Sequence, residues 1–111
     1  MKYLEYKGYT GSIEYSPEDD LLYGKVLGVQ GLISYEGETG KLLEADFKEA
    51  IDTYLADCKA AGEKPEKPFK GSFNVRIPAA LHQKAALLAM EAKTSLNNFV
   101  AEAIRLRVQK S

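Results

Sequence analysis

Residues 72–77 form a short run in which polar and apolar side chains alternate, and two short helices are all that follows it. Phe73, Val75 and Ile77 fall at alternate positions, as on one face of a β-strand. Residues 71–111 are too few to bury a sufficient hydrophobic core, and a lone strand leaves its backbone hydrogen bonds unmade. A twofold dimer solves both problems, because the strand can then pair antiparallel with its copy in a second chain.

The two helices are predicted from the spacing of apolar residues. Pro78 ends the strand and can occupy the first position of a helix that carries Leu81, Ala85, Leu88 and Ala92. Ser95 is a good N-cap for a last helix over about 96–108. The expected dimer core combines one strand face with this last helix and consists of Phe73, Val75, Ile77, Phe99 and Val100.

The first part of the chain predicts an α+β domain. Strands are expected at 9–15, 21–27 and 32–36, with turns between them and Gly24 as a candidate bulge. The expected arrangement is an antiparallel meander covered by one helix. That helix is expected over about 41–61.

The helix is defined by its caps and by one apolar stripe. Thr39 is the expected N-cap and Gly62 the expected C-terminal stop. Cys58 lies on the stripe, where we expect a small core residue. The stripe comprises Leu43, Phe47, Ala50, Ile51, Tyr54, Leu55 and Cys58.

Three segments follow from these patterns: an α+β domain over 1–62, a linker over 63–70, and a strand–helix–helix module over 71–111. The linker contains two prolines and is rich in charge, which favours a semi-rigid, solvated connector. The charge changes at the same place. The formal total is −1, but residues 1–70 hold 9 basic and 14 acidic side chains, whereas 71–111 hold 6 basic and 2 acidic ones. This asymmetry indicates two different tasks.

Several classes of function are disfavoured. Cys58 and His82 are the single cysteine and histidine, so a disulfide framework and a Cys/His metal site are not expected. The acidic residues form no recognisable catalytic constellation, so we expect neither an enzyme nor a cofactor. The N-terminal sequence has no apolar signal region, and no apolar run has the roughly 18–20 residues needed to span a membrane. The cytoplasm is the expected location.

The distribution of the tyrosines indicates an interaction surface in the first part of the chain. All seven lie in residues 1–54, more than a small core needs. Tyrosine is favoured at protein interfaces, because it buries a large area and keeps a polar tip. We expect about half of them in the core and the rest on a partner-binding or oligomer surface.

In a two-stranded ribbon, Ser72, Asn74 and Arg76 lie on the open face. Such a ribbon fits the major groove of DNA, where Arg can bind guanine and Asn can bind adenine. The helix N-terminus at Ser95 and Leu96 offers backbone N–H groups to a phosphate, and Lys93 adds positive charge. The competing interpretation is a strand face that simply contacts solvent.

The run from Gly71 to Pro78, followed by Leu81, His82 and the turn at Ser95–Asn97, resembles the ribbon-helix-helix DNA-binding fold of the Arc/MetJ type. The longer stretch from Asp46 to Ile104 resembles the HicB family of antitoxins, and the similarity extends upstream. This resemblance implies an N-terminal domain similar to part of an RNase H fold, which inhibits an mRNA-cleaving HicA toxin. It also implies that the C-terminal module binds DNA and that the antitoxin thereby represses its own operon.

The resemblance assigns base reading to Ser72, Asn74 and Arg76, and the phosphate clamp to Ser95 and Leu96. One departure from the pattern concerns the turn before Ser95. Many ribbon-helix-helix chains have glycine there, which tolerates positive φ, whereas this chain has Lys93 and Thr94.

Three hypotheses follow. The first is an antitoxin and autorepressor that binds operator DNA and a HicA-type toxin as a homodimer, with a tetramer as a further assembly. The second is a solitary ribbon-helix-helix regulator whose first domain is a sensor or oligomerisation domain. The third is an interaction protein whose ribbon serves only dimerisation. A neighbouring toxin gene separates the first two, and salt-dependent DNA binding separates both from the third.

Overall fold

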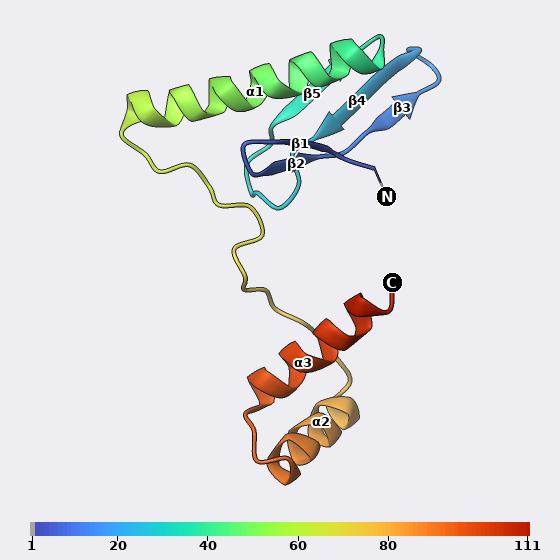
Figure 1. The fold of residues 1–111 in the computed structure, drawn as a ribbon, viewed down its shortest axis with the longest axis vertical. Coiled ribbons are helices and arrows are strands. Elements are labelled where there is room, and N and C mark those ends of the chain that lie inside the picture. The colour runs from blue at the N-terminus through green and yellow to red at the C-terminus, as the bar shows by residue number, and fades with distance from the viewer. Residues whose placement is uncertain (1) are drawn as a thin grey trace. The chain divides into compact units, whose positions relative to one another are not determined.

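The computed structural model describes residues 2–111, which form an α+β chain with two small antiparallel sheets and three helices (Figure 1). The chain separates into two compact units that divide between Ser72 and Phe73. No helix within the described residues is both long enough and apolar enough to cross a membrane.

The first unit contains all five strands: β1 (Leu4–Tyr6), β2 (Tyr9–Gly11), β3 (Glu14–Ser16), β4 (Leu21–Lys25) and β5 (Ser34–Gly37). β1 pairs antiparallel with β2, and the second sheet has the order β3-β4-β5 with antiparallel pairing throughout. An isolated bridge between Gly11 and Val26 links the two sheets. In the order β3-β4-β5, β5 is a terminal strand, and it has one free edge.

Helix α1 (Gly40–Ala61) packs against the sheet, mainly along β5, as Figure 1 shows. The predicted caps are confirmed: the Thr39 hydroxyl accepts a hydrogen bond from the Leu42 N–H at 3.2 Å, and Gly62 adopts φ 68°. These groups satisfy backbone atoms that the helix ends leave unpaired. The apolar stripe is also confirmed, with Leu43, Phe47, Ile51 and Cys58 buried.

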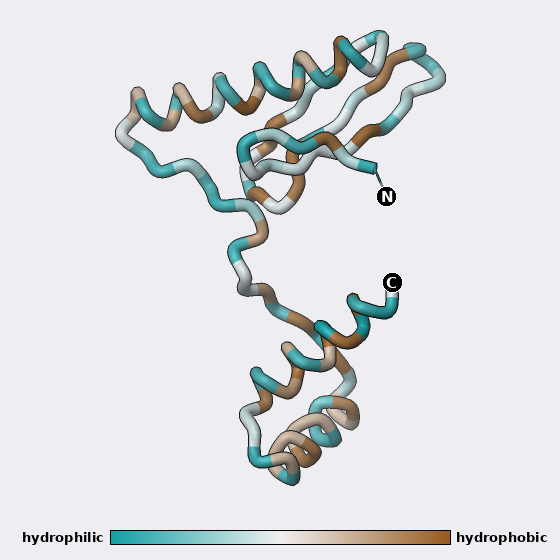
Figure 2. Tube along the Cα trace, in the orientation of Figure 1, coloured by the Kyte–Doolittle hydropathy of each residue, from teal (hydrophilic) through white to brown (hydrophobic). Residues whose placement is uncertain are grey.

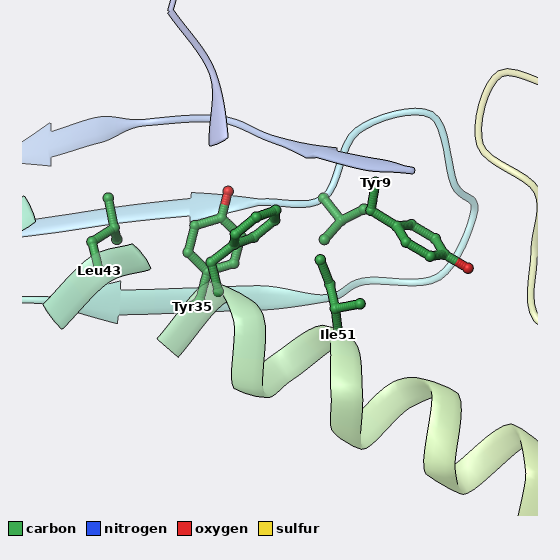
Figure 3. Packing of buried hydrophobic residues seen from close by; sticks show 6 residues of the cluster. Tyr9, Tyr35, Leu43 and Ile51 are labelled. Carbon is green, nitrogen blue, oxygen red and sulfur yellow. The ribbon is translucent and has the colours of Figure 1, made fainter. Parts of the chain in front are cut away.

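The core lies between α1 and the sheet, where Tyr9 and Tyr35 face Leu43 and Ile51 (Figure 3). The Tyr35 ring lies edge-on to Phe47, with 5.0 Å between ring centroids. The Tyr35 hydroxyl donates to the Ser12 carbonyl oxygen at 2.7 Å, and burial raises the pKa of this phenol to about 12. Tyr35 is thus a neutral core residue that satisfies a strand carbonyl.

The predicted bulge at Gly24 is wrong. Gly24 pairs regularly with Tyr35 in the β4–β5 ladder. Glycine is needed there for another reason, because a Cβ would lie 2.0 Å from the Ser12 carbonyl oxygen. The sheet departs from regular pairing at Ser12, between β2 and β3, where the hydroxyl accepts from the Lys25 N–H at 3.0 Å.

β1 was not among the predicted strands, and the single strand predicted over 9–15 is wrong, because the chain divides there into β2 and β3, which belong to different sheets. β1 turns into β2 through Lys7 and Gly8, which both have positive φ values, 50° and 83°. The Lys7 ammonium and the Tyr6 hydroxyl donate to the Asp52 carboxylate of α1 at 2.8 and 3.0 Å. The hydrogen bond from Lys7 lowers the pKa of Asp52. Side chains distant in sequence therefore hold this hairpin against α1, and a local pattern does not reveal them.

The segment 63–70, which the sequence predicts as a solvated linker, contacts the first unit. Glu66 is held at three points: its carboxylate accepts from the Gln30 and Gly31 N–H groups at 2.8 and 3.0 Å, its N–H donates to the Tyr54 hydroxyl, and its carbonyl accepts from Tyr9. The two loop N–H groups lower the pKa of Glu66. The boundary between the compact units accordingly falls after this segment, at Ser72.

The second unit consists of α2 (Ala79–Glu91) and α3 (Leu96–Gln109), and residues 73–78 precede α2. α2 begins at Ala79, so Pro78 precedes the helix and does not occupy its first position as predicted. Ser95 caps α3 as predicted, with its hydroxyl accepting from the Asn98 N–H at 3.0 Å. Ala89 is the one buried side chain in residues 73–111.

Candidate functional site

The strand expected over residues 72–77 is not formed in the single chain, where the segment before α2 has no regular secondary structure. All of its residues from Gly71 to Pro78 are exposed, including Phe73, Val75 and Ile77 at 72%, 60% and 44%. Within the described residues, no backbone hydrogen bond joins 72–77 to another segment. Apolar side chains and backbone groups of this segment are thus both left without partners in the single chain.

The helices of this unit also expose apolar side chains. Figure 2 shows brown, apolar positions recurring along α2, α3 and the segment that precedes them. Contiguous exposed apolar surface of this kind marks interaction sites. Of the expected dimer core, Phe99 is half-buried and Val100 is 38% exposed. Exposed residues beyond that predicted set include Leu81, Leu87, Leu88, Met90, Ile104, Leu106 and Val108.

The predicted base-reading side chains are accessible. Asn74 and Arg76 are exposed on the extended segment, and Ser72 is exposed at the end of the first unit. They alternate with the three apolar residues, so an extended backbone places the two sets on opposite faces. A strand formed by this segment would therefore have one apolar face and one face with hydrogen-bonding side chains.

The N-terminus of α3 has the predicted free donors. The Ser95 hydroxyl and carbonyl take the N–H groups of Asn98 and Phe99. The N–H groups of Leu96 and Asn97 precede these and have no acceptor among the described residues. Two free N–H groups at the positive end of a helix dipole can bind an anion.

The charge of this unit is largely unpaired. Arg105 forms an ion pair with Glu102, and its hydrogen bonds lower the pKa of that carboxylate. The other cations have no ion-pair partner within the described residues; they are Arg76, Lys84, Lys93, Arg107 and Lys110. The surface is therefore suited to a polyanion.

Other candidate chemistry is not assembled. His82 is exposed near the start of α2, where its backbone N–H donates to the Pro78 carbonyl oxygen at 3.1 Å. Over residues 2–111, no three His, Cys, Asp or Glu side chains cluster so as to hold a metal ion. The acidic residues of the first unit lie on its surface instead.

The tyrosines divide much as expected. Tyr9 and Tyr35 are buried, whereas Tyr3, Tyr15 and Tyr23 are exposed in the first unit. The exposed tyrosines mark surface that a partner protein can contact.

The turn between α2 and α3 contains a residue in the left-handed conformation, although the chain has no glycine there. Lys93 has φ 55°, and its N–H donates to the Met90 carbonyl oxygen at 3.0 Å. This left-handed conformation is unfavourable for any residue with a Cβ and favourable for glycine.

Lys93→Gly is therefore expected to stabilise the second unit by about 0.5–1 kcal/mol. Lys84→Gly, in the regular interior of α2, is the matched control and should destabilise it by about 1 kcal/mol. Thermal unfolding followed by far-ultraviolet circular dichroism at fixed protein concentration measures both. Equal destabilisation by the two variants would contradict the left-handed turn.

These features define a class: a small α+β protein with a helical unit whose apolar side chains are largely exposed in the single chain. Residues 54–104 match the family model described as the HicB family. The match runs from the second half of α1 through segment 63–70 into α3, and the sheet lies outside it. No curated protein and no solved structure matches the chain.

Proposed function

We propose that this chain is a HicB-family antitoxin of a type II toxin–antitoxin system. In this proposal the first unit binds and neutralises a HicA-type, mRNA-cleaving toxin. Residues 71–111 form a ribbon-helix-helix homodimer that binds operator DNA and represses the operon. The chain itself is not an enzyme and acts by binding alone.

The exposed apolar strand segment carries the proposal. Phe73, Val75 and Ile77 are solvent-exposed in the single chain. Transfer of such a side chain from water into an apolar core is favourable by roughly 1.5–3 kcal/mol when it is fully buried. Antiparallel pairing of 72–77 with its copy supplies the missing backbone hydrogen bonds at the same time. The exposed faces of α2 and α3 supply the rest of a shared core.

DNA binding follows from the other face of the same segment. A symmetric ribbon presents two copies of Ser72, Asn74 and Arg76 on its outer face, as a major-groove reader requires. The free N–H groups at the start of α3 and the side chain of Lys93 then contact phosphates. The unpaired cations are doubled in the dimer, which favours a polyanion.

Toxin binding rests on the family match and on the acidic, tyrosine-bearing surface of the first unit. The second candidate is a solitary ribbon-helix-helix regulator, in which the first unit is a sensor or oligomerisation domain. It is favoured by the position of the match, because the sheet lies outside residues 54–104. An adjacent gene that encodes a HicA-type protein would favour the antitoxin over the solitary regulator.

Arg76→Ala tests the DNA-binding role. We expect operator affinity to fall by roughly 1–3 kcal/mol and base preference to relax at one position of each half-site. Arg107→Ala is the matched control, because Arg107 lies in the last turn of α3 and is not one of the predicted base-reading residues. It should weaken binding uniformly across sequences, if at all. Gel shifts at two salt concentrations on operator and scrambled DNA measure these effects, and unchanged operator preference in Arg76→Ala would contradict the ribbon assignment.

A further inference from the structure

Three adjoining cavities run from the β3-β4-β5 sheet past β5 to one side of α1, and we call them together the β5–α1 groove. Their volumes are about 610, 480 and 680 Å³. Asp46 lines all three, and Glu36 and Glu49 each line two. The cavities therefore form one continuous surface within the first unit.

The groove is acidic along its whole length. Glu18 and Asp19 lie at one end, Asp57 lies at the other, and Glu38 lines the cavity at the start of α1. No lysine or arginine lines any of the three cavities in the described part of the chain. The surface thus carries charge of one sign.

The acidic residues of α1 that lie outside the groove are neutralised, whereas those inside are not. Glu44 pairs with Lys48 at 3.6 Å, and Asp52 pairs with Lys7 at 2.8 Å. Among residues 2–111, none of the carboxylates in the groove forms an ion pair. Lys7 and Lys48 thus pair with acids outside the groove, whereas the acids inside have no ion-pair partner among the described residues.

Exposed apolar side chains accompany these carboxylates. Leu32 is 80% exposed beside β5, Leu42 is half-exposed on α1, and Tyr15 and Tyr23 are exposed on the sheet. Large apolar and aromatic groups supply most of the energy at protein interfaces, while the surrounding charges set partner choice. The groove offers both.

An added β-strand is a poor fit for this edge. The Asp46 carboxylate accepts a hydrogen bond from the Glu36 N–H at 2.9 Å, so one of the outward donors of β5 is already occupied. An acidic side chain covering an edge strand also discourages strand pairing. A partner must instead approach with its side chains.

We propose that the β5–α1 groove is the toxin-binding surface of the first unit, and that the toxin meets it with a face rich in lysine and arginine. This inference rests on the proposed antitoxin function. The groove carboxylates attract the cationic side chains, and Leu32, Leu42 and the two tyrosines contact apolar groups between them. A nuclease that binds RNA needs a basic surface, and such a surface is complementary in charge to the groove.

The test compares two charge-matched double variants of the full-length chain. Glu38→Lys/Glu49→Lys reverses two exposed groove residues, while Glu5→Lys/Glu63→Lys reverses two exposed residues outside it. Asp46 is left intact because it holds β5. The probe is the HicA-type protein encoded beside this gene, with its catalytic histidine replaced, and calorimetric titration gives the Kd.

The groove variant is expected to raise the Kd by about 30-fold or more, and the control by less than about 3-fold. Binding by the unmodified chain should weaken with added NaCl more steeply than binding by the groove variant. Unchanged thermal unfolding shows that each variant is folded.

Equal Kd values for both variants would overturn the groove assignment while leaving the antitoxin function in place. Absence of an adjacent HicA-type gene, or no binding by the unmodified chain, would overturn the antitoxin function and this inference with it. The groove's alternative occupant is the basic second unit of another copy. If the groove variant alone changes the oligomeric state without toxin, the inference is also wrong.

Discussion

Val75→Asp is expected to convert the dimer into a monomer in which residues 73–111 no longer hold their helices. Val75 lies on the apolar face of the extended segment and is 60% exposed in the single chain. In the proposed dimer that face is buried between two chains. An uncompensated buried charge costs roughly 3–5 kcal/mol, and the symmetric dimer contains two. This exceeds what so small a unit can lose, because one buried side chain, Ala89, is all the interior that it has.

The composition of the chain allows the two units to be followed separately. All seven tyrosines lie in residues 1–54 and there is no tryptophan, so intrinsic fluorescence reports on the first unit alone. For Val75→Asp we expect reduced helical circular dichroism with unchanged tyrosine fluorescence, and a monomer in sedimentation velocity.

Asn74→Asp is the matched control for this experiment. It introduces the same charge one residue away, on the opposite face of the strand. The dimer should persist, and DNA binding should fall because the new carboxylate faces the phosphates. If both variants remain dimeric, residues 72–77 do not form the buried ribbon.

Phe47→Ala is expected to destabilise the first unit by about 3–5 kcal/mol. The Phe47 side chain is fully buried, contacts the Tyr35 ring, and lies so close to Gly11 that a Cβ there would be 2.7 Å from its Cε1 atom. Its removal leaves a cavity that a glycine backbone and a tightly packed ring cannot fill. Urea unfolding followed by tyrosine fluorescence measures the loss.

In Phe47→Ala, toxin binding should fall because the first unit is less stable, whereas DNA binding through residues 71–111 should persist. Phe69→Ala is the matched control, because Phe69 is 65% exposed. It should cost no more than about 1 kcal/mol, as most surface substitutions do. Loss of DNA binding in Phe47→Ala would contradict the separation of tasks between the two units.

Features that depend on local sequence were predicted well. Thr39, Gly62 and Ser95 act within a few residues of themselves, so helix caps can be recognised from residue type and spacing. The α1 stripe follows from the helical period in the same way.

Features that depend on distant contacts were not predicted. The β1–β2 hairpin is held by Asp52, which lies 45 residues beyond Lys7. Gly24 is required because the Ser12 carbonyl oxygen lies against it, and no local pattern distinguishes this from a bulge. Segment 63–70 has the composition of a linker, but Glu66 finds its partners at Gln30 and Gly31.

The sequence alone determined the α+β composition, the three helices with the caps at Thr39, Gly62 and Ser95, and the opposite charges of the two parts of the chain. It also determined the alternation of 72–77, because a period of two is a property of neighbouring residues. The tertiary structure decided which carboxylates lie together without cations in the β5–α1 groove, since that depends on how α1 crosses β5. It also decided that residues 73–111 bury almost nothing by themselves, because burial depends on which surfaces meet in space.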